Sequence, residues 1–584
     1  MGHNLLWAAQ SSPVWIREHL QPARLPPGGP TGLTPVLSHP AAPHTAPPRK
    51  GSLALNAWFL DDGTQVGKLE DLNQVIDILV HEGPAHGLIL STSLTVVPPS
   101  TPKSTIWCPT QTADGRDPTG RGIRRVTEEG IILLGAPLGS EAFVGDEVQK
   151  KVEKIREITA LLPNIEDPHT EFCLLRSCLA FPKLSYLLRT VDTSSHLEHL
   201  QEFDRITKEG LIRVLGTPIG ERTWQQAKLP VSLGGVGLRQ AQDHAPAAHT
   251  ASILSLQVLM QSMLGVGEEA VQLHQEGEGD EDGDLSAGLL AALSAAQGEL
   301  ASKAELVGLT QRQISVKIDL HQHQKLMEEV GEEEVRERAR LLSLSLPHAG
   351  DWLNTPPLTA LGLHLRAAEF ILAMKYRLGL PVFDREGPCP ACLRHSDILG
   401  DHALCCGTGG ERISRHNNLR DAFFDTAAQA GLAPVKEGRF LLPGADRRPA
   451  DVLLHNWVGG LDAAMDVTVV NPLQAATVAG AATTGGHALG HAYDRKMAAG
   501  AEDCRSQGIV LLPLAAESLG GWHGAAEKEV KKLAAALARN TGQPEGEAAA
   551  HLWGRLGVLL QRGNAAILGN RVPAPADAII DGIL

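Results

Sequence analysis

The chain has 584 residues and carries 52 lysines and arginines against 67 aspartates and glutamates, a net charge of −15. This length is enough for several cores, because single domains usually stop growing before about 300 residues. The acidic balance argues against a constitutive nucleic-acid coat protein, which needs clustered basic residues to neutralise phosphates. It leaves room for an enzyme with a local basic groove.

Targeting signals and membrane spans are not expected. The first twenty residues lack a basic start followed by an apolar core, which argues against a secretory signal. No uninterrupted apolar run approaches ~20 residues, which argues against a transmembrane helix. Four of the eight cysteines fall in one short window, 389–406. In a reducing compartment this clustering favours metal binding over disulfides, so the protein is expected to be intracellular.

The first 140 residues divide into a leader and a folded segment. Residues 1–50 hold nine prolines between Pro22 and Pro48, which predicts a disordered leader. A folded segment over 51–140 begins with a strand pattern near Leu53. The elements expected after the turn at Asp61-Asp62-Gly63 are a helix over 69–80 and a strand over 87–97.

A helical region is predicted for 141–263, because apolar residues recur at helical spacing from Val148 to Leu162. Further helices are expected over 170–189 and 197–215. Residues 264–284 are predicted to be an acidic linker, with eight acids and no base after Glu268. Helices over 285–345 and 361–378 then make up a helical connector that ends at 385.

Beyond a Cys/His window at 386–407, alternating helices and strands predict a small α/β domain over 408–545. The expected elements are helices over 412–430 and 487–504 and strands over 450–454, 464–470 and 509–514. Residues 546–584 are predicted to be a tail with one short helix. The fold class is therefore multidomain, α+β followed by α/β.

The Cys/His window has the spacing C-x2-C-x9-H-x3-C, formed by Cys389, Cys392, His402 and Cys406. Two cysteines two residues apart can clasp one side of a tetrahedral Zn²⁺, and the second pair can close the other side. Four ligands leave no open position, so the site would be structural. Cys405 is an alternative fourth ligand, and a chance grouping of four small residues is the alternative to a metal site.

Two sets of carboxylates suggest metal-dependent chemistry. Asp61 and Asp62 stand at a turn between strands, where polymerases hold two divalent cations, although Asp-Asp-Gly is also an ordinary hairpin turn. Asp451 and Asp466 fall in two strand-like runs joined by a Gly-Gly turn, so a hairpin would bring both acids to one Mg²⁺. In this arrangement a lysine polarises the attacking water.

Two such acids resemble the site of PD-(D/E)xK nucleases, whose lysine would fall at position 468, where this chain has a threonine. Lys496 on the following helix is therefore the candidate for that lysine, and Glu437 is the candidate third acid. Strand-edge aspartates and an exposed helical lysine would explain the same pattern without any activity.

The first half of the chain resembles the reverse transcriptases of non-LTR retrotransposons. The matching motifs are AWFLDDG (57–63), GLIL (87–90), LGAPLG (134–139), LRSCL (175–179), PKL (182–184), LPV (229–231), GGVGLR (234–239) and HAPAA (244–248). The resemblance implies a partial polymerase palm followed by a helical thumb. A working polymerase needs another aspartate from an upstream strand, whereas residues 1–60 contain no aspartate and Glu18 is their only acid. The chain is therefore predicted not to polymerise on its own.

The second half resembles the restriction-like, PD-(D/E)xK type endonuclease region of the same elements. The matching motifs are GDHA (400–403), GER (410–412), RHN (415–417), LRD (419–421), RPAD (448–451), DVTVV (466–470), PL (513–514) with Glu517, and GGW (520–522). In that family a zinc knuckle precedes the nuclease, and its pattern favours Cys406 as the fourth ligand. The family's K-x-x-K-Y helix is broken here, because Ala499 and Gly500 follow Lys496.

This resemblance implies metal-dependent nicking of DNA, whose free 3′-OH would prime reverse transcription, in the nucleus. It implies DNA and element RNA as partners, with an intact reverse transcriptase acting in trans. Arg412, Arg415 and His416 are candidate phosphate contacts, for which a helix cap or a core position is the alternative.

The leading hypothesis is a truncated retrotransposon protein that retains a structural zinc and a nuclease. The alternatives are a catalytically dead relic that binds nucleic acid or protein, and a locus that yields no stable protein because the palm lacks its central strands.

Overall fold

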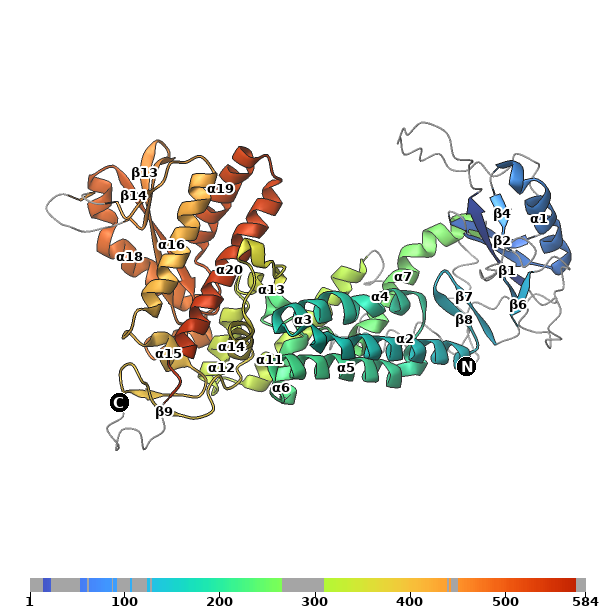
Figure 1. The fold of residues 1–584 in the computed structure, drawn as a ribbon, viewed down its shortest axis with the longest axis horizontal. Helices are drawn as coiled ribbons and strands as arrows, with labels where there is room; N and C mark the ends of the chain where they lie inside the picture. The colour runs from blue at the N-terminus through green and yellow to red at the C-terminus, as the bar shows by residue number, and fades with distance from the viewer. Residues whose placement is uncertain are drawn as a thin grey trace, which may run out of the picture.

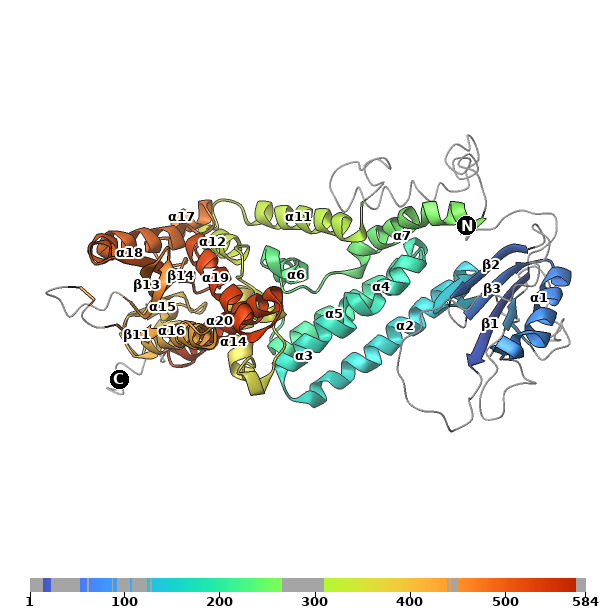
Figure 2. The ribbon, with the colours of Figure 1, turned by 90° about the horizontal axis from the view of Figure 1, so that it is seen from above.

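The computed structural model is mostly helical, with small sheets at both ends of an elongated chain (Figures 1 and 2). It describes residues 14–22, 53–59, 62–86, 88–91, 105–107, 123–126, 129–264, 309–438, 441–442 and 450–573. Of the helices within these ranges, none combines the length and the apolar character that a membrane crossing requires. Figure 1 shows a sheet with one helix at one end, a long helical middle and an α/β unit at the other end.

The N-terminal sheet has the order β2-β3-β1-β5-β6, and β4 also pairs with β1. Its strands are β1 (Val14–Pro22), β2 (Leu53–Phe59), β3 (Asp62–Gly67), β4 (Leu88–Leu90), β5 (Thr105–Trp107) and β6 (Arg124–Val126). Helix α1 (Leu69–His81) matches the predicted helix and buries Leu72 and Ile76 in a small core with Leu90. A separate hairpin joins β7 (Gly130–Leu133) to β8 (Ala136–Gly139).

Strand β1 corrects two expectations. It lies inside residues 1–50, which were predicted to be disordered, and it occupies the position between β3 and β5 that the palm was expected to lack. The physical reason is local, because the β-branched and aromatic residues Val14, Trp15 and Ile16 favour a strand just ahead of the proline-rich run. In its antiparallel pairing with β3, His19 lies opposite Asp62 and Glu18 opposite Gly63.

The predicted hairpin between β2 and β3 is present, with Phe59 opposite Asp62. Asp61 lies outside the described residues. Of the strand predicted over 87–97, β4 covers only 88–90, and residues 92–100 also lie outside the described part of the chain.

The helical middle consists of α2 (Glu141–Leu161), α3 (Pro168–Leu174), α4 (Phe181–Thr190), α5 (Leu197–Leu215), α6 (Glu221–Lys228) and α7 (Ala241–Leu264). Of the apolar stripe predicted along 148–162, Val148, Val152 and Ile155 pack against α4 and α5 in one core, whereas Ile158 and Leu162 belong to a neighbouring core. The connector contributes α11 (Gln311–Val330), α12 (Val335–Leu344), α13 (Asp351–Asn354) and α14 (Ala367–Arg377).

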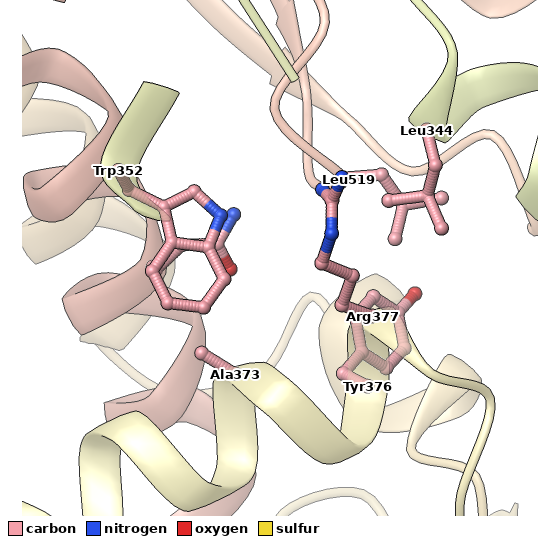
Figure 3. Close-up of a pocket in the computed structure, with 7 residues that line it drawn as sticks. Leu344, Trp352, Ala373, Tyr376, Arg377 and Leu519 are labelled. Carbon is pink, nitrogen blue, oxygen red and sulfur yellow. The ribbon is translucent and has the colours of Figure 1, made fainter. Parts of the chain in front are cut away.

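The connector and the helical middle share a core in which Trp352 and Phe370 pack with Trp224 and Leu211. Arg377 is fully buried at this junction, and its guanidinium donates to the carbonyls of Val231, Gly235 and Ala349 at 2.9–3.1 Å. Figure 3 shows Arg377 and Tyr376 beside a narrow cavity, which Trp352 and Leu519 also line. The cavity lies where the connector meets the α/β unit.

The C-terminal unit contains a mixed four-stranded sheet of order β11-β12-β13-β14. Its strands are β11 (Val435–Lys436), β12 (Val452–Val458), β13 (Leu461–Val470) and β14 (Ile509–Glu517), and a short pair, β9 (Gly387–Pro388) and β10 (His395–Ser396), precedes them. Its helices are α15 (Asp401–Cys405), α16 (Glu411–Gln429), α17 (Val478–Thr483), α18 (His487–Ser506), α19 (Gly524–Thr541) and α20 (Glu545–Gly569). The two strands and two helices predicted to carry the site lie in β12, β13, α16 and α18.

The C-terminal residues were predicted to be a tail with one short helix, and this prediction is wrong. Helix α20 has 25 residues and is largely buried. Leu552, Trp553 and Leu556 pack with Phe423 and Trp522 in the main core of the C-terminal unit. The apolar residues of α20 are interrupted by glycines, which allow close packing against α14 and α16 but weaken the helical signal in the sequence. A boundary at 545 would therefore cut through a core.

Helix α20 gives a direct test of this packing. Replacing Leu556, which is fully buried, with alanine is expected to lower the free energy of unfolding by about 2–5 kcal/mol, because the cavity left behind is only partly refilled. The matched change His551→Ala, at an exposed position on the same helix, should cost within about 0.5 kcal/mol. Equal losses for both variants, measured by chemical denaturation, would contradict a core role for α20.

Candidate metal and nuclease sites

The first half of the Cys/His cluster is a tight turn between β9 and β10. The backbone N–H of Cys389 donates to the carbonyl of Arg394, and the N–H of Leu393 donates to the carbonyl of Cys389, both at 2.8 Å. Leu393 has a φ of +61°, a left-handed conformation that closes the turn. The turn places the thiols of Cys389 and Cys392 on the same side as α15.

The second half comes from α15 and the residue after it. The Asp397 carboxylate accepts the backbone N–H groups of Leu399, Asp401 and His402 at 2.9–3.1 Å, which fixes the first turn of α15. His402 and Cys406 then face the turn, and Cys392 Sγ lies 3.2 Å from His402 Nε2.

The ligand atoms of Cys389, Cys392, His402 and Cys406 all lie within 4.8 Å of one another. Three thiolates and one imidazole at this spacing suit a tetrahedral zinc ion. Cys405, the alternative ligand, lies elsewhere: its Sγ accepts a hydrogen bond from Asn471 Nδ2 at 3.3 Å. The residues present therefore fit a structural zinc held by Cys406.

Asp451 and Asp466 lie on neighbouring strands. Asp451 immediately precedes β12, and its backbone N–H donates to the carbonyl of Met465 on β13 at 2.9 Å. Its carboxylate accepts from the N–H of Val467 at 2.7 Å and from Nε2 of His416 at 3.1 Å. The side chain is therefore fixed beside the position of Asp466 in β13.

Lys496 reaches this pair from α18. Its ammonium group lies 2.9 Å from Oδ1 and 2.8 Å from Oδ2 of Asp466. The crossover helix between two parallel strands packs on the sheet, and this packing carries Lys496 over β13. The structure thus brings together Asp451, Asp466 and Lys496, with His416 as an added member.

The charges of these groups influence one another. Burial raises the pKa of Asp466, Lys496 opposes that rise, and the negative charge of Asp451 adds to it. The hydrogen bond to Asp451 raises the pKa of His416. Two carboxylates that interact across neighbouring strands supply the hard oxygen ligands that Mg²⁺ prefers, so the donor set fits such an ion.

Glu437 lies beside the site through its backbone rather than its carboxylate. Its N–H donates to the carbonyl of Asp451 at 3.0 Å, while its side chain forms an ion pair with Arg420. Arg420 also donates to Asp421 at 2.9 Å.

The three candidate phosphate contacts lie in different surroundings. Arg412 donates to the carbonyl of Cys405 at 3.2 Å. Arg415 is buried under α20, where it donates to Asn564 Oδ1 at 2.7 Å and burial lowers its pKa to about 10. Arg415 therefore occupies a core position, which was the alternative to a phosphate contact. The neighbouring basic residues Arg447 and Arg448 lie outside the described residues.

The role of His416 beside Asp451 was not predicted. The available signal was its spacing from Arg420, because residues four apart lie on one face of a helix and this face of α16 packs against the sheet. The sequence alone did not show which of the two basic residues would contact Asp451.

The comparison with known proteins gives one distant match. Over 191 residues, 33% of this chain, it is 28% identical to the retrotransposable element SLACS 132 kDa protein of Trypanosoma brucei gambiense. The matched segment spans only 15% of that protein. No model of a protein family matches the chain. The chain is therefore distantly related to a retrotransposon protein.

The zinc cluster predicts opposite outcomes for two adjacent cysteines. Cys406→Ser is expected to reduce bound zinc by one equivalent per chain and to open the 386–407 window to protease, because the metal supplies much of the folding free energy there. Cys405→Ser should keep its zinc, since this thiol contacts Asn471 instead. Metal analysis after dialysis measures both, and zinc loss from Cys405→Ser with retention in Cys406→Ser would reverse the assignment.

The His416–Asp451 pair predicts a pH-dependent stability. Because the folded-state pKa of His416 is raised, its contribution is fully present below the unfolded histidine pKa of about 6.5 and is lost as pH rises through the folded value. His416→Gln should therefore lower the free energy of unfolding more at about pH 5.5 than at about pH 8.5. His455→Gln, which removes an exposed pair with Asp462, is the control and should have little effect. A His416→Gln effect that grows with pH would contradict the pairing.

Proposed function

We propose that this chain derives from a non-LTR retrotransposon and that its C-terminal α/β unit is a Mg²⁺-dependent endonuclease that nicks DNA. One observation carries the proposal: an ammonium group, Lys496 Nζ, contacts the Asp466 carboxylate while Asp451 lies on the adjacent strand. A lysine in contact with one of two neighbouring carboxylates is the donor set that phosphodiester hydrolysis needs.

Each group would have a distinct role. Asp451 and Asp466 would hold the cation, which supplies Lewis acidity to the phosphate when bound. Lys496, about a third exposed on its side chain, would orient the attacking water and stabilise negative charge that develops on the phosphate. His416 would hold the Asp451 carboxylate in position through the 3.1 Å hydrogen bond.

The N-terminal sheet is proposed to be a polymerase remnant without activity of its own. Strand β1 has Glu18 opposite Gly63, where a two-metal polymerase site of the family it resembles would need an upstream aspartate. Reverse transcription from the nick would then need an intact enzyme in trans, with DNA and element RNA as the partners.

A second candidate function is a catalytically dead relic that binds nucleic acid or protein. The ion pair between Glu437 and Arg420 favours it, because it engages the third acid away from Asp466. Ala499 and Gly500 on α18, where the family has a second lysine and a tyrosine, favour it as well. Salt-dependent DNA binding without cleavage would support this alternative.

Plasmid nicking by the purified full-length chain distinguishes the two. With Mg²⁺ or Mn²⁺ we expect conversion of supercoiled to open-circular DNA, reduced at least about 100-fold in Asp451→Asn, Asp466→Asn and Lys496→Ala. The full chain is required because α20 is part of the core. The same preparations are expected to give no primer extension on a primed RNA template.

The control for Lys496→Ala is Arg495→Ala, which removes the same charge from an exposed neighbouring position on α18. This variant should keep most of the nicking activity. If nicking survives in Asp451→Asn and Asp466→Asn, the cleavage comes from a contaminant and the endonuclease proposal fails.

A further inference from the structure

A second group of metal-ligating side chains lies far from the zinc cluster, where α5 begins. A short 3₁₀ turn, Ser194–His196, leads into α5, and His196 is the residue that precedes its first turn. Ligand atoms of His196, Glu198 and His199 all lie within 4.8 Å of one another. The two imidazole rings are stacked with centroids 6.2 Å apart, and His199 Nε2 lies 3.7 Å from Glu198 Oε1.

His196 is the most enclosed of the three residues. It is only 7% exposed, yet its ring nitrogens are not closed off from solvent. The exposed Glu198 and the half-buried His199 leave the opposite side of the group open to solvent, so an ion can reach it.

Helix α2 approaches the His196 ring closely at Gly145. A Cβ atom at Gly145 would lie 3.0 Å from Cε1 and 3.1 Å from Nδ1 of His196, closer than ordinary van der Waals contact. A glycine inside a helix costs about 1 kcal/mol relative to alanine. Gly145 therefore makes α2 less stable at the point where the imidazole packs against it. The ring is thereby held in one orientation beside Glu198 and His199.

We propose that His196, Glu198 and His199 form a second zinc site in the helical middle of the protein. Two neutral imidazoles and one carboxylate are ligands that suit Zn²⁺ and leave one coordination position for water. All three ligands come from four consecutive residues, so the ion would order the turn before α5 and its contact with α2 rather than crosslink distant segments.

The charge balance sets the expected strength of this site. With one carboxylate the bound ion keeps a net charge of about +1, and it lies at a helix N-terminus, where the helix dipole already places partial positive charge. The Cys389 cluster has three thiolates and encloses its ion. The His196 site should therefore bind zinc more weakly and release it first to a competing chelator.

The test is zinc stoichiometry of the full-length protein at about pH 7.5, because protons compete with the metal for imidazole ligands at lower pH. The wild-type chain saturated with Zn²⁺ is expected to bind one equivalent more than His199→Gln or Glu198→Gln. These two positions are chosen because they are more exposed than His196, so the variants should fold. His551→Gln, an exposed histidine on α20, is the control and should match wild type.

Cobalt distinguishes the two sites in the same protein. Co²⁺ in the cysteine cluster gives thiolate charge-transfer absorption, whereas Co²⁺ at the His196 site gives only weak ligand-field bands. His199→Gln should lose the ligand-field increment and keep the charge-transfer band, and Cys406→Ser should do the reverse. Equal zinc stoichiometry in wild type, His199→Gln and Glu198→Gln would overturn the proposal.

Discussion

The parallel pairing of β13 with β14 is the constraint on which the C-terminal site depends. Nine residue pairs align these strands, from Asp462 opposite Ile509 to Val470 opposite Glu517. Two parallel neighbours cannot be joined by a hairpin, so the chain must cross over, and α18 is that crossover. Residue 468 of β13 is a threonine, and the lysine proposed for the site, Lys496, lies on a helix that this topology holds against the strand. The ion pair between Lys496 and Asp466 follows from the sheet order.

The C-terminal α/β unit also depends on the packing of α20 in its core. Trp553 meets Trp522 of the sheet side at a ring separation of 5.8 Å and stacks on His348 of the connector at 3.7 Å. A single helix thus contacts both the α/β core and the connector, while buried Arg377 ties the connector to the helical middle through the backbone carbonyls of Val231 and Gly235. Motion of the C-terminal unit against the helical middle would have to break these buried contacts.

Elements with strong periodicity could be predicted from the sequence, and those defined by long-range packing could not. Helix α5 has the predicted bounds because its apolar stripe and the glycine at 216 mark both ends. Helix α20 was underestimated because its burial depends on partners as distant in sequence as Phe423 and Trp352. Strand β1 was missed because the prolines that follow it dominate the composition of residues 1–50.

The candidate sites follow the same division. Ligand spacing predicted Cys389, Cys392 and His402, because the turn and α15 are local structures, and it left Cys405 and Cys406 as alternatives for the fourth ligand. The family resemblance favoured Cys406, and the structure agrees, since Cys405 contacts Asn471 on another part of the fold. The partner of Asp451 likewise needed the packing of α16 on the sheet, since both His416 and Arg420 face that way.

The negative net charge of this protein limits the ways in which it could bind DNA, the proposed substrate. Eight of the acids lie between Glu268 and Asp284, outside the described residues, so the net charge of −15 is unevenly spread. Two of the basic residues on α16 add little to the basic surface, because Arg415 is buried against Asn564 and Arg420 is bound by Glu437 and Asp421. Affinity that depends on counterion release needs free cations. Any DNA contact near Asp466 must therefore rely on the bound cation and Lys496 more than on a basic groove, which makes weak, metal-dependent association the consistent physical expectation.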